Sequence, residues 1–400
     1  MYNNELHIKS KNFLLIIVSS GLSRFGFSAF NLIAIWVILY LTRSPLLSGL
    51  ADGTLSVPLF LSFIIGAYVD SFRDKKLLAI LSGTFRALSL ILILIGSLLN
   101  NLTLMVSGVY FAAFVIGFTS DIINSVRAYW TKEFLNETQY KSGTSISEMA
   151  FNLAEGFGYI VSGVLLSFGI VQAFAILLLF FIASLIPLNF IRIYVGKIQD
   201  KIDLAKNIKT GLHFVVKSRN VLEILIITLI GNLILNVAGI LFIILIQIKY
   251  NLPAFYVSYV FGILVLGMFL GSITGRKTKG KLVNIIILAF MSIGVSLVSI
   301  YYVKNFYLIF LPAITIGLTT GIANVAASAA ILKIVPQELM ARVQGTINTF
   351  GVAGITVSGM IGGALTQFVG ILNAFLILGS AFIVISPFLT FFKSLHGIII

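Results

Sequence analysis

The sequence of 400 residues contains no cysteine, only 3 histidines and only 13 acidic residues. The lack of cysteine excludes disulfides, thiolate chemistry and cysteine-ligated metal sites. The few histidines and carboxylates form no recognisable nucleophile–base pair or metal-ligand cluster, and no phosphate-binding loop is present. We therefore expect neither an enzyme nor a protein that holds a cofactor.

Charge of either sign is scarce, because charged residues make up 10% of the chain and hydrophobic residues 59%. A soluble protein has about 25% charged and about 45–50% apolar residues, so the composition is typical of a membrane protein. A spanning helix needs about 20 mostly apolar residues. The apolar runs that satisfy this are 13–41, 46–69, 77–99, 102–130, 142–166, 172–193, 222–249, 253–274, 282–303, 306–334, 341–369 and 373–392.

These twelve runs predict an all-α polytopic membrane protein. The one long gap divides it into an N-terminal bundle (1–193), a linker (194–221) and a C-terminal bundle (222–400). Within the linker, Leu204, Ile208 and Leu212 recur at helical spacing opposite lysines. This pattern predicts an amphipathic helix at the inner membrane surface, and we interpret it as a connection between the bundles.

The basic residues predict the orientation. If the N-terminus is cytoplasmic, 22 of the 27 lysines and arginines lie in cytoplasmic segments and only 3 in outer loops. This asymmetry follows the positive-inside rule and accounts for the net charge of +14 without a nucleic-acid partner. The polar stretch before residue 12 is not typical of a secretory signal, and we interpret it as a short cytoplasmic tail. We expect a multi-pass protein of the cell membrane with both termini inside.

The two halves repeat one pattern with an offset of just over 200 residues. Ser20, Arg24 and Ser28 precede Thr228, Asn232 and Asn236 by 208 positions, and Pro45 precedes Pro253 by the same number. Two parallel six-helix repeats are a known plan of secondary transporters, with the substrate path between them.

A charged loop joins the second and third predicted helices. It reads Gly66-Ala67-Tyr68-Val69-Asp70-Ser71-Phe72-Arg73-Asp74-Lys75-Lys76. With the repeat, this loop resembles that of the major facilitator superfamily, and the resemblance covers essentially the whole chain. More narrowly, the loop, Arg86 and the segment Val335–Val343 are similar to the branch that exports drugs, macrolides and siderophores. In place of that branch's Gly-Pro antiporter motif, the chain has Gly156-Phe157-Gly158.

The resemblance implies alternating access, with a small-molecule substrate, the lipid bilayer as environment, protons as the candidate coupling ion and a monomeric state. It also implies that Asp121 pairs with a basic residue of the charged loop, with Arg73 as the candidate. Asp70 has no acidic counterpart in the second repeat, and it could cap the N-terminal end of the eleventh helix. The predicted cytoplasmic latch therefore consists of Gly66, Asp70, Arg73, Lys75, Lys76 and Asp121.

Ionisable groups at membrane depth usually face a cavity or a partner. Those predicted at depth all lie in the first half: Arg24, Asp52, Arg86, Asp121, Glu148 and Glu155. Arg24 either faces the transport path, where it contacts an acidic group or an anionic substrate, or belongs to a structural ion pair. Glu148 and Glu155 are seven residues apart and share a helix face. Glu155 is either the proton-coupling carboxylate or part of a static salt bridge.

Uncharged polar residues complete the set of candidates for substrate contact. Ser28 and Asn31 lie on the same stripe as Arg24, and the second half contributes two further pairs. These are Asn232 with Asn236 and Thr320 with Asn324. Hydrogen bonding between helices, without substrate contact, is the alternative role for all of them.

The predicted function is secondary active transport, with export of amphipathic small molecules as the first candidate. Uptake of a nutrient or an organic anion by the same fold is the alternative. A carrier of anions into the cell would be expected to have a second cation at mid-membrane in the second half, and the sequence has none.

Overall fold

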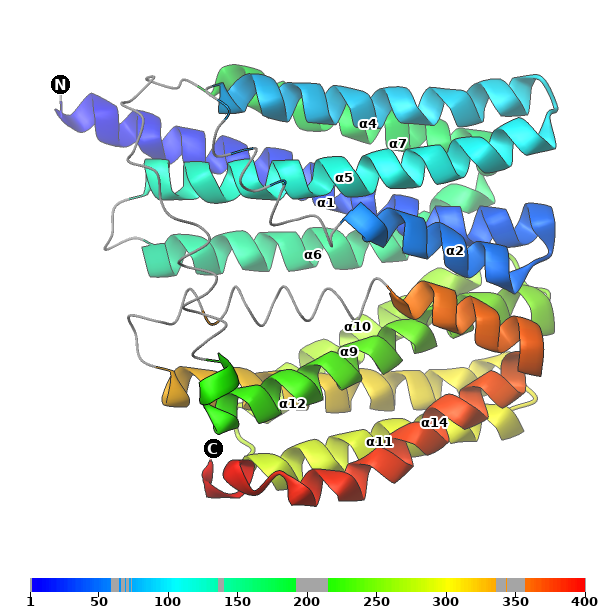
Figure 1. The fold of residues 1–400 in the computed structure, drawn as a ribbon. Coiled ribbons are helices and arrows are strands. Elements are labelled where there is room, and N and C mark those ends of the chain that lie inside the picture. The colour runs from blue at the N-terminus through cyan, green and yellow to red at the C-terminus, as the bar shows by residue number, and fades with distance from the viewer. Residues whose placement is uncertain are drawn as a thin grey trace. The chain divides into compact units, whose positions relative to one another are not determined.

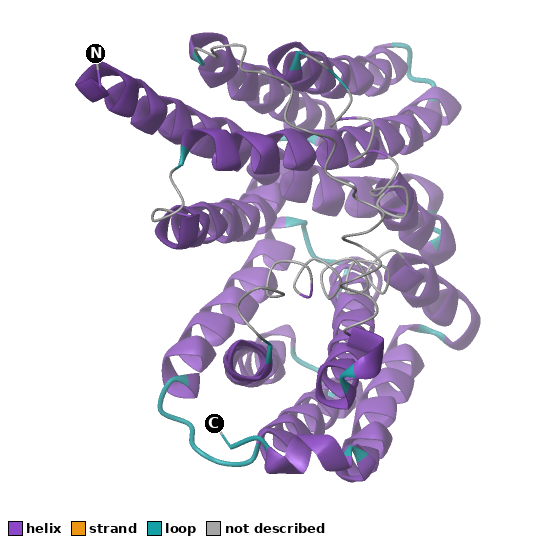
Figure 2. Ribbon diagram, turned by 60° about the vertical axis from the view of Figure 1, so that its left-hand side comes forward, coloured by secondary structure: helices purple, strands orange, loops and turns teal. Residues whose placement is uncertain are grey.

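The computed structural model describes residues 2–58, 74–135, 140–191, 215–335 and 357–399, and the single positions 65, 69, 72 and 343. Within these residues all long elements are helices (Figure 2), and the β pairing is one isolated bridge between Lys281 and Ile399. The expected all-α polytopic fold is confirmed. Most of the predicted linker, including its amphipathic helix, lies outside the described residues.

The helices of the first half follow the predicted apolar runs (Figure 1). They are α1 (Tyr2–Thr42), α2 (Pro45–Ser56), α4 (Lys75–Leu98), α5 (Leu102–Phe134), α6 (Tyr140–Ser167) and α7 (Ile170–Phe190). Side chains that cap helix N-termini mark several of the boundaries. Asp74 accepts a hydrogen bond from the amide of Leu77 at 2.9 Å, and Asn101 accepts one from Leu104 at 3.0 Å.

The helices of the second half also match their apolar runs. They are α9 (Arg219–Ile244), continued by the π-helical turn η3 (Leu245–Lys249), α10 (Phe255–Gly275), α11 (Leu282–Tyr302), the 3₁₀ turn η4 (Phe306–Ile309), α12 (Phe310–Ile334), Val357–Val369, α14 (Ile371–Phe388), and the 3₁₀ turns η6 (Leu389–Phe391) and η7 (Lys393–Gly397). Of the predicted run 341–369, the part before Val357 is described only at Val343.

The polar stretch before residue 12 is helical, because α1 begins at Tyr2. This stretch holds no glycine or proline that would end a helix, and polarity alone does not break one. The part of α1 that is apolar enough to span a membrane is Lys11–Thr42, close to the predicted run 13–41.

Ten helices of the described chain are long and apolar enough to cross a membrane. Large apolar side chains lie open on their outer surfaces, such as Phe368 with 80% of its surface exposed and Leu98 with 78%. A water-soluble protein would not leave so much apolar surface uncovered, whereas a bilayer solvates it.

The internal repeat is visible in the helix neighbours of each half. In the first half α4 packs against α5 and α7, and α1 packs against α7. In the second half α11 packs against α12 and α14 in the same way, and α9 packs against α14. The backbone repeats as well, because Arg43 and Asn251, each two residues before the paired prolines, have positive φ angles of 56° and 51°.

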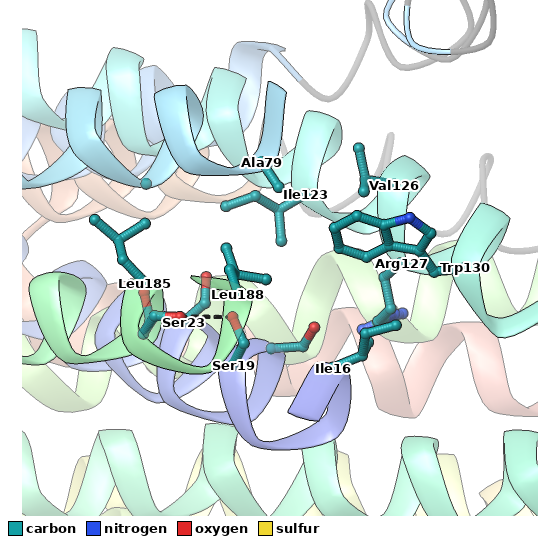
Figure 3. A pocket seen from close by; sticks show the side chains of 13 residues that line it. Ile16, Ser19, Ser23, Ala79, Ile123, Val126, Arg127, Trp130, Leu185 and Leu188 are labelled. Carbon is teal, nitrogen blue, oxygen red and sulfur yellow. Dashed lines mark hydrogen bonds between the residues drawn. The ribbon is translucent and has the colours of Figure 1, made fainter. Parts of the chain in front are cut away.

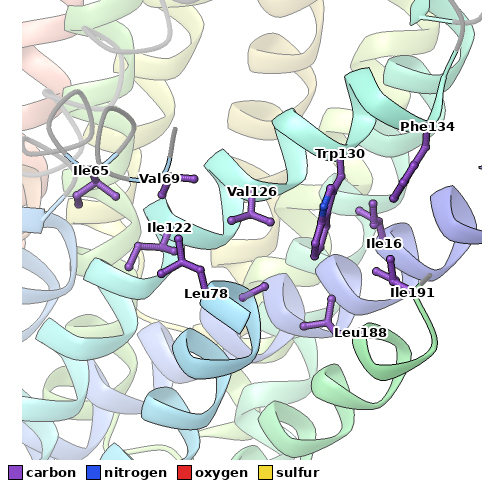
Figure 4. Close-up of a cluster of buried hydrophobic side chains, with 11 residues drawn as sticks. Ile16, Ile65, Val69, Leu78, Ile122, Val126, Trp130, Phe134, Leu188 and Ile191 are labelled. Atoms are coloured by element: carbon purple, nitrogen blue, oxygen red, sulfur yellow. The ribbon is translucent and has the colours of Figure 1, made fainter. Parts of the chain in front are cut away.

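The chain forms two compact units, one of Met1–Asp200 with Pro253–Ser258 and one of Lys201–Leu252 with Tyr259–Ile400. The boundaries predicted near 193 and 222 remain predictions, because the chain between them lies largely outside the described residues. Within the first unit, a buried apolar cluster joins α1, α4, α5 and α7 at the ends nearest the charged loop (Figure 4). Trp130 belongs to it, as do Ile65 and Val69 of the second apolar run.

Helices α1 and α6 approach closely at Gly158. A Cβ atom on Gly158 would lie 2.6 Å from the backbone oxygen of Phe25 and would overlap the hydroxyl of Ser28. Glycine therefore permits the close approach of the two helices that carry Arg24 and Glu155.

We predict that Gly158→Ala lowers the stability of the folded protein by about 1–3 kcal/mol, the usual cost of overpacking. The added methyl group must push α1 and α6 apart, because backbone atoms surround it. Thermal unfolding in detergent measures the effect. Gly21→Ala is the matched control, because a Cβ atom there would meet nothing within 4 Å. An unchanged melting temperature for Gly158→Ala would contradict the prediction.

Candidate functional site

An ion pair between α1 and α6 joins two of the charged residues that the sequence predicts at membrane depth. Nη2 of Arg24 lies 2.8 Å from Oε2 of Glu155, and Nε of Arg24 donates to the same oxygen at 3.0 Å. The two side chains keep 35% and 28% of their surface exposed. The ring of Phe27 lies 5.6 Å from the guanidinium of Arg24 and forms an apolar wall beside the pair.

The other two candidates on α1 have different surroundings. The hydroxyl of Ser28 donates to the backbone oxygens of Arg24 and Phe25, and the side chain is fully buried beneath Gly158. Asn31 instead donates from Nδ2 to Oδ1 of Asp52 on α2 at 2.6 Å. Ser28 thus serves the packing of α1, whereas Asn31 ties α1 to a buried carboxylate.

Sequence reasoning did not select Asp52 and Tyr159 as site residues. Tyr159 follows Glu155 by one turn of α6 and is an electrostatic neighbour of Glu155, Asp52 and Arg24. Asp52 could have been selected from the sequence, because it is a charged residue inside an apolar run. No comparable sequence feature distinguished Tyr159 from the other tyrosines. Glu148 belongs to α6 as predicted, but its side chain lies outside the described part of the chain.

Among the charged residues of the first unit whose side chains are described, Arg86 on α4 is the most deeply buried, with 2% of its surface exposed. Its guanidinium donates to three hydroxyl groups: from Nε to Thr119 at 2.8 Å, from Nη2 to Ser120 at 2.6 Å, and from Nη1 to Ser23. The ring of Phe181 on α7 lies 5.8 Å from it. One side chain therefore connects α1, α4, α5 and α7.

Two small cavities of about 10 Å³ each lie inside this bundle, and both are lined by Ser20, Ser23, Ile123 and Arg127. Such a volume has room for roughly one water molecule. The first cavity extends to Trp130 (Figure 3), whose buried Nε1 finds no hydrogen-bond partner within the described residues. The second reaches Arg24 and Arg86.

The two lysines of the predicted latch bind elements of the first unit. Nζ of Lys76 donates to the backbone oxygens of Asn189 and Ile191, each at 2.9 Å, at the C-terminal end of α7. A cation is favourable there, because the carbonyl groups of a helix end carry partial negative charge. Nζ of Lys75 donates to the backbone oxygen of Phe72 at 2.7 Å and lies 4.8 Å from the ring centre of Tyr129.

The rest of the latch is only partly described. Asp121 on α5 is buried, with 7% of its surface exposed, and is an electrostatic neighbour of Arg86. Gly66, Asp70 and Arg73 lie outside the described residues, as does the segment 336–341 that Asp70 was expected to cap. The contacts predicted between Asp121 and Arg73, and between Asp70 and the eleventh helix, therefore remain predictions.

The candidates of the second unit lie on α9 and α12. Nδ2 of Asn236 donates to the backbone oxygen of Asn232 at 2.7 Å, so this contact stays within α9. On α12, Asn324 is exposed, and Oγ1 of Thr320 is buried without a hydrogen-bond partner in the described structure. An unpartnered buried hydroxyl is costly, which makes Thr320 the more unusual of the pair.

Comparison with known protein families identifies the fold. Residues 16–354 match the model of the Major Facilitator Superfamily. The chain belongs to this superfamily. Among curated proteins, no sequence matches it.

Solved transporter structures share its fold at low sequence identity. The nucleoside transporter NupG superposes with a TM-score of 0.70 at 13% identity, over 96% of this chain and 99% of that one. A POT family transporter in complex with 5-aminolevulinic acid gives 0.73 at 13% identity, over 96% of both chains. A structure described under proton dependent oligopeptide transporters gives 0.68 at 13% identity, over 97% and 99%.

The family match and the apolar helices show that this chain is a multi-pass membrane protein with a transporter fold. Membership of the family indicates a transporter and not an enzyme. The similar structures named above are nucleoside and POT transporters. They do not specifically support the narrower resemblance to exporters of drugs, macrolides and siderophores.

We predict that Arg86→Lys destabilises the first unit of this protein. A lysine keeps the charge, but its compact ammonium group cannot reach hydroxyl groups on two other helices at once. Each lost hydrogen bond to a charged group costs about 1.5–3 kcal/mol. The melting temperature in detergent should fall, whereas the exposed control Arg276→Lys should melt like the wild type. Equal melting of all three proteins would contradict the prediction.

Proposed function

We propose that this chain is a proton-coupled secondary transporter that works by alternating access, with the Arg24–Glu155 ion pair as its coupling element. The observation that supports this most is the pair itself. It joins α1 and α6 at a depth where charge is costly, yet both side chains remain partly exposed. Such a pair adds little to stability, because the desolvation of two charges can cost more free energy than their attraction returns.

In this proposal, a proton that binds Glu155 neutralises the carboxylate and releases Arg24 from the pair. Arg24 then interacts with the substrate, and loss of the proton restores the pair. Binding of substrate and binding of the proton are thereby linked, since each changes the electrostatic environment of the other. Tyr159 is an electrostatic neighbour of both Glu155 and Asp52, so a change of charge on Glu155 alters its surroundings.

For direction and substrate, we propose export of amphipathic small molecules from the cell, with the protein in the cell membrane as a monomer. The resemblance of the charged loop, Arg86 and the segment Val335–Val343 to the exporter branch supports export. The aromatic residues near the ion pair, including Phe27, suit a substrate with an apolar body.

Uptake of a small polar solute is the second candidate. It is favoured by the solved structures of the same fold, which are described as nucleoside and POT family transporters. One of them is described under proton dependent oligopeptide transporters, and this also supports coupling to protons.

The coupling role is tested in proteoliposomes that contain the purified full-length protein and an imposed pH gradient. The wild type should accumulate a transported dye against its concentration gradient, and Glu155→Gln should only equilibrate it, because the glutamine cannot bind or release a proton. Glu133→Gln changes an exposed acid on α5 and should behave like the wild type. Uphill transport by Glu155→Gln would show that the pair is structural.

Direction is tested in cells that express the protein and are loaded with ethidium or fluorescein, an amphipathic cation and an amphipathic anion. Export predicts faster loss of at least one dye than in cells without the protein, and a protonophore should abolish the difference. Retention of both dyes, together with proton-dependent uptake of a nucleoside or peptide, would favour the second candidate.

A further inference from the structure

Three guanidinium groups from three helices line one cavity in the first unit. Arg24 comes from α1, Arg86 from α4 and Arg127 from α5. The other lining residues are Ser20, Ser23, Phe27, Ser120, Ile123 and Asn124. The wall is therefore built from cations, hydroxyl groups and one amide, with two apolar side chains.

No carboxylate is among the described residues that line this cavity. Two described acids interact with the lining arginines, because Glu155 binds Arg24 and Asp121 is an electrostatic neighbour of Arg86. Arg24 and Arg86 are themselves close enough to interact as like charges. Bringing like charges together in a medium of low dielectric is unfavourable, and an anion between them would relieve the repulsion.

The positive wall also determines which ions can enter. Arginines that face a narrow polar space exclude protons and cations from it. Guanidinium groups instead match the planar geometry of carboxylates and phosphates, with two parallel N–H donors.

Size and access narrow the ligand further. The cavity holds about 10 Å³, so it takes one oxygen of an oxyanion and not a whole organic molecule. Arg24, which lines the cavity, keeps 35% of its side chain exposed. Phe27, which lies 5.6 Å from Arg24 and also lines the cavity, offers an apolar surface beside it.

The geometry points to a binding site for the carboxylate group of an amphipathic organic anion, held by Arg24, Arg127 and the neighbouring hydroxyl and amide groups. The carboxylate oxygen enters the cavity while the apolar body stays against Phe27. This inference rests on the proposed function and names its substrate class, since the carboxylate would compete with Glu155 for Arg24. Arg86, already bonded to three hydroxyl groups, supplies positive charge from deeper in the bundle.

Binding of benzoate to the full-length protein in detergent tests this site, with benzamide as the uncharged analogue of the same shape. Isothermal calorimetry and thermal stabilisation should both detect benzoate and not benzamide. Chloride is the third probe, because a free halide could occupy the same positive cavity. Fluorescein efflux, measured as described above, should be inhibited by benzoate.

Two variants locate the site. Arg127→Gln removes a guanidinium from the wall, and benzoate should bind at least about tenfold more weakly, as expected when a charge-assisted hydrogen bond is lost. Asn124→Leu keeps all three arginines and fills the cavity, and it should have a similar effect. Arg276→Gln removes an exposed arginine from the end of α10 and should bind like the wild type. Variants are compared after gel filtration has shown a wild-type profile.

Each outcome decides the inference separately from the proposed function. Selective benzoate binding that both variants weaken would support the site, even if Glu155→Gln were to retain uphill transport. Equal binding of benzoate and benzamide, or unchanged binding in both variants, would overturn it while proton-driven transport stands. A further outcome is that chloride displaces benzoate at equal concentration and stabilises the protein to the same extent. That outcome would assign the cavity to a free halide and overturn the carboxylate assignment.

Discussion

The cost of a buried positive charge governs the packing of the first unit. A guanidinium with 2% of its surface exposed must have its donors satisfied, or the bundle would lose several kcal/mol to the uncompensated charge. Arg86 meets this requirement with hydroxyl groups from α1 and α5, and these helices can supply them only at one separation and one rotation. The same requirement places Ser23, and with it the adjacent Arg24, which pairs with Glu155 of α6.

The positions of the membrane helices were predictable because hydropathy depends on sequence alone. In a bilayer every backbone group must be bonded within its helix, so a long apolar run has few alternatives. The boundaries of α5, α11 and α12 therefore lie close to their predicted limits. Helix α1 begins before its predicted apolar run, because hydropathy marks where a helix enters the bilayer and not where it begins.

The partners of the polar residues were much less predictable. Helical spacing assigns Arg24, Ser28 and Asn31 to one stripe, but their surroundings differ because each turn of α1 meets a different neighbour. Gly158 closes the space around Ser28, and Asp52 lies opposite Asn31. Neither contact is encoded in the local pattern. Lys76 shows the same limit, because its charge suggested a loop facing the cytoplasm and its ligands are the last carbonyl groups of α7.

The repeat makes the difference between the halves informative. Both units arrange their helices in the same neighbour pattern, so the fold does not require a charge at mid-membrane. Arg24 corresponds to Asn232 in the second repeat, and Ser28 corresponds to Asn236. An amide side chain can form hydrogen bonds with a substrate, but the amide itself does not gain or lose a proton at physiological pH. The carboxylates predicted at membrane depth all belong to the first half, so they are the candidates for a coupling proton.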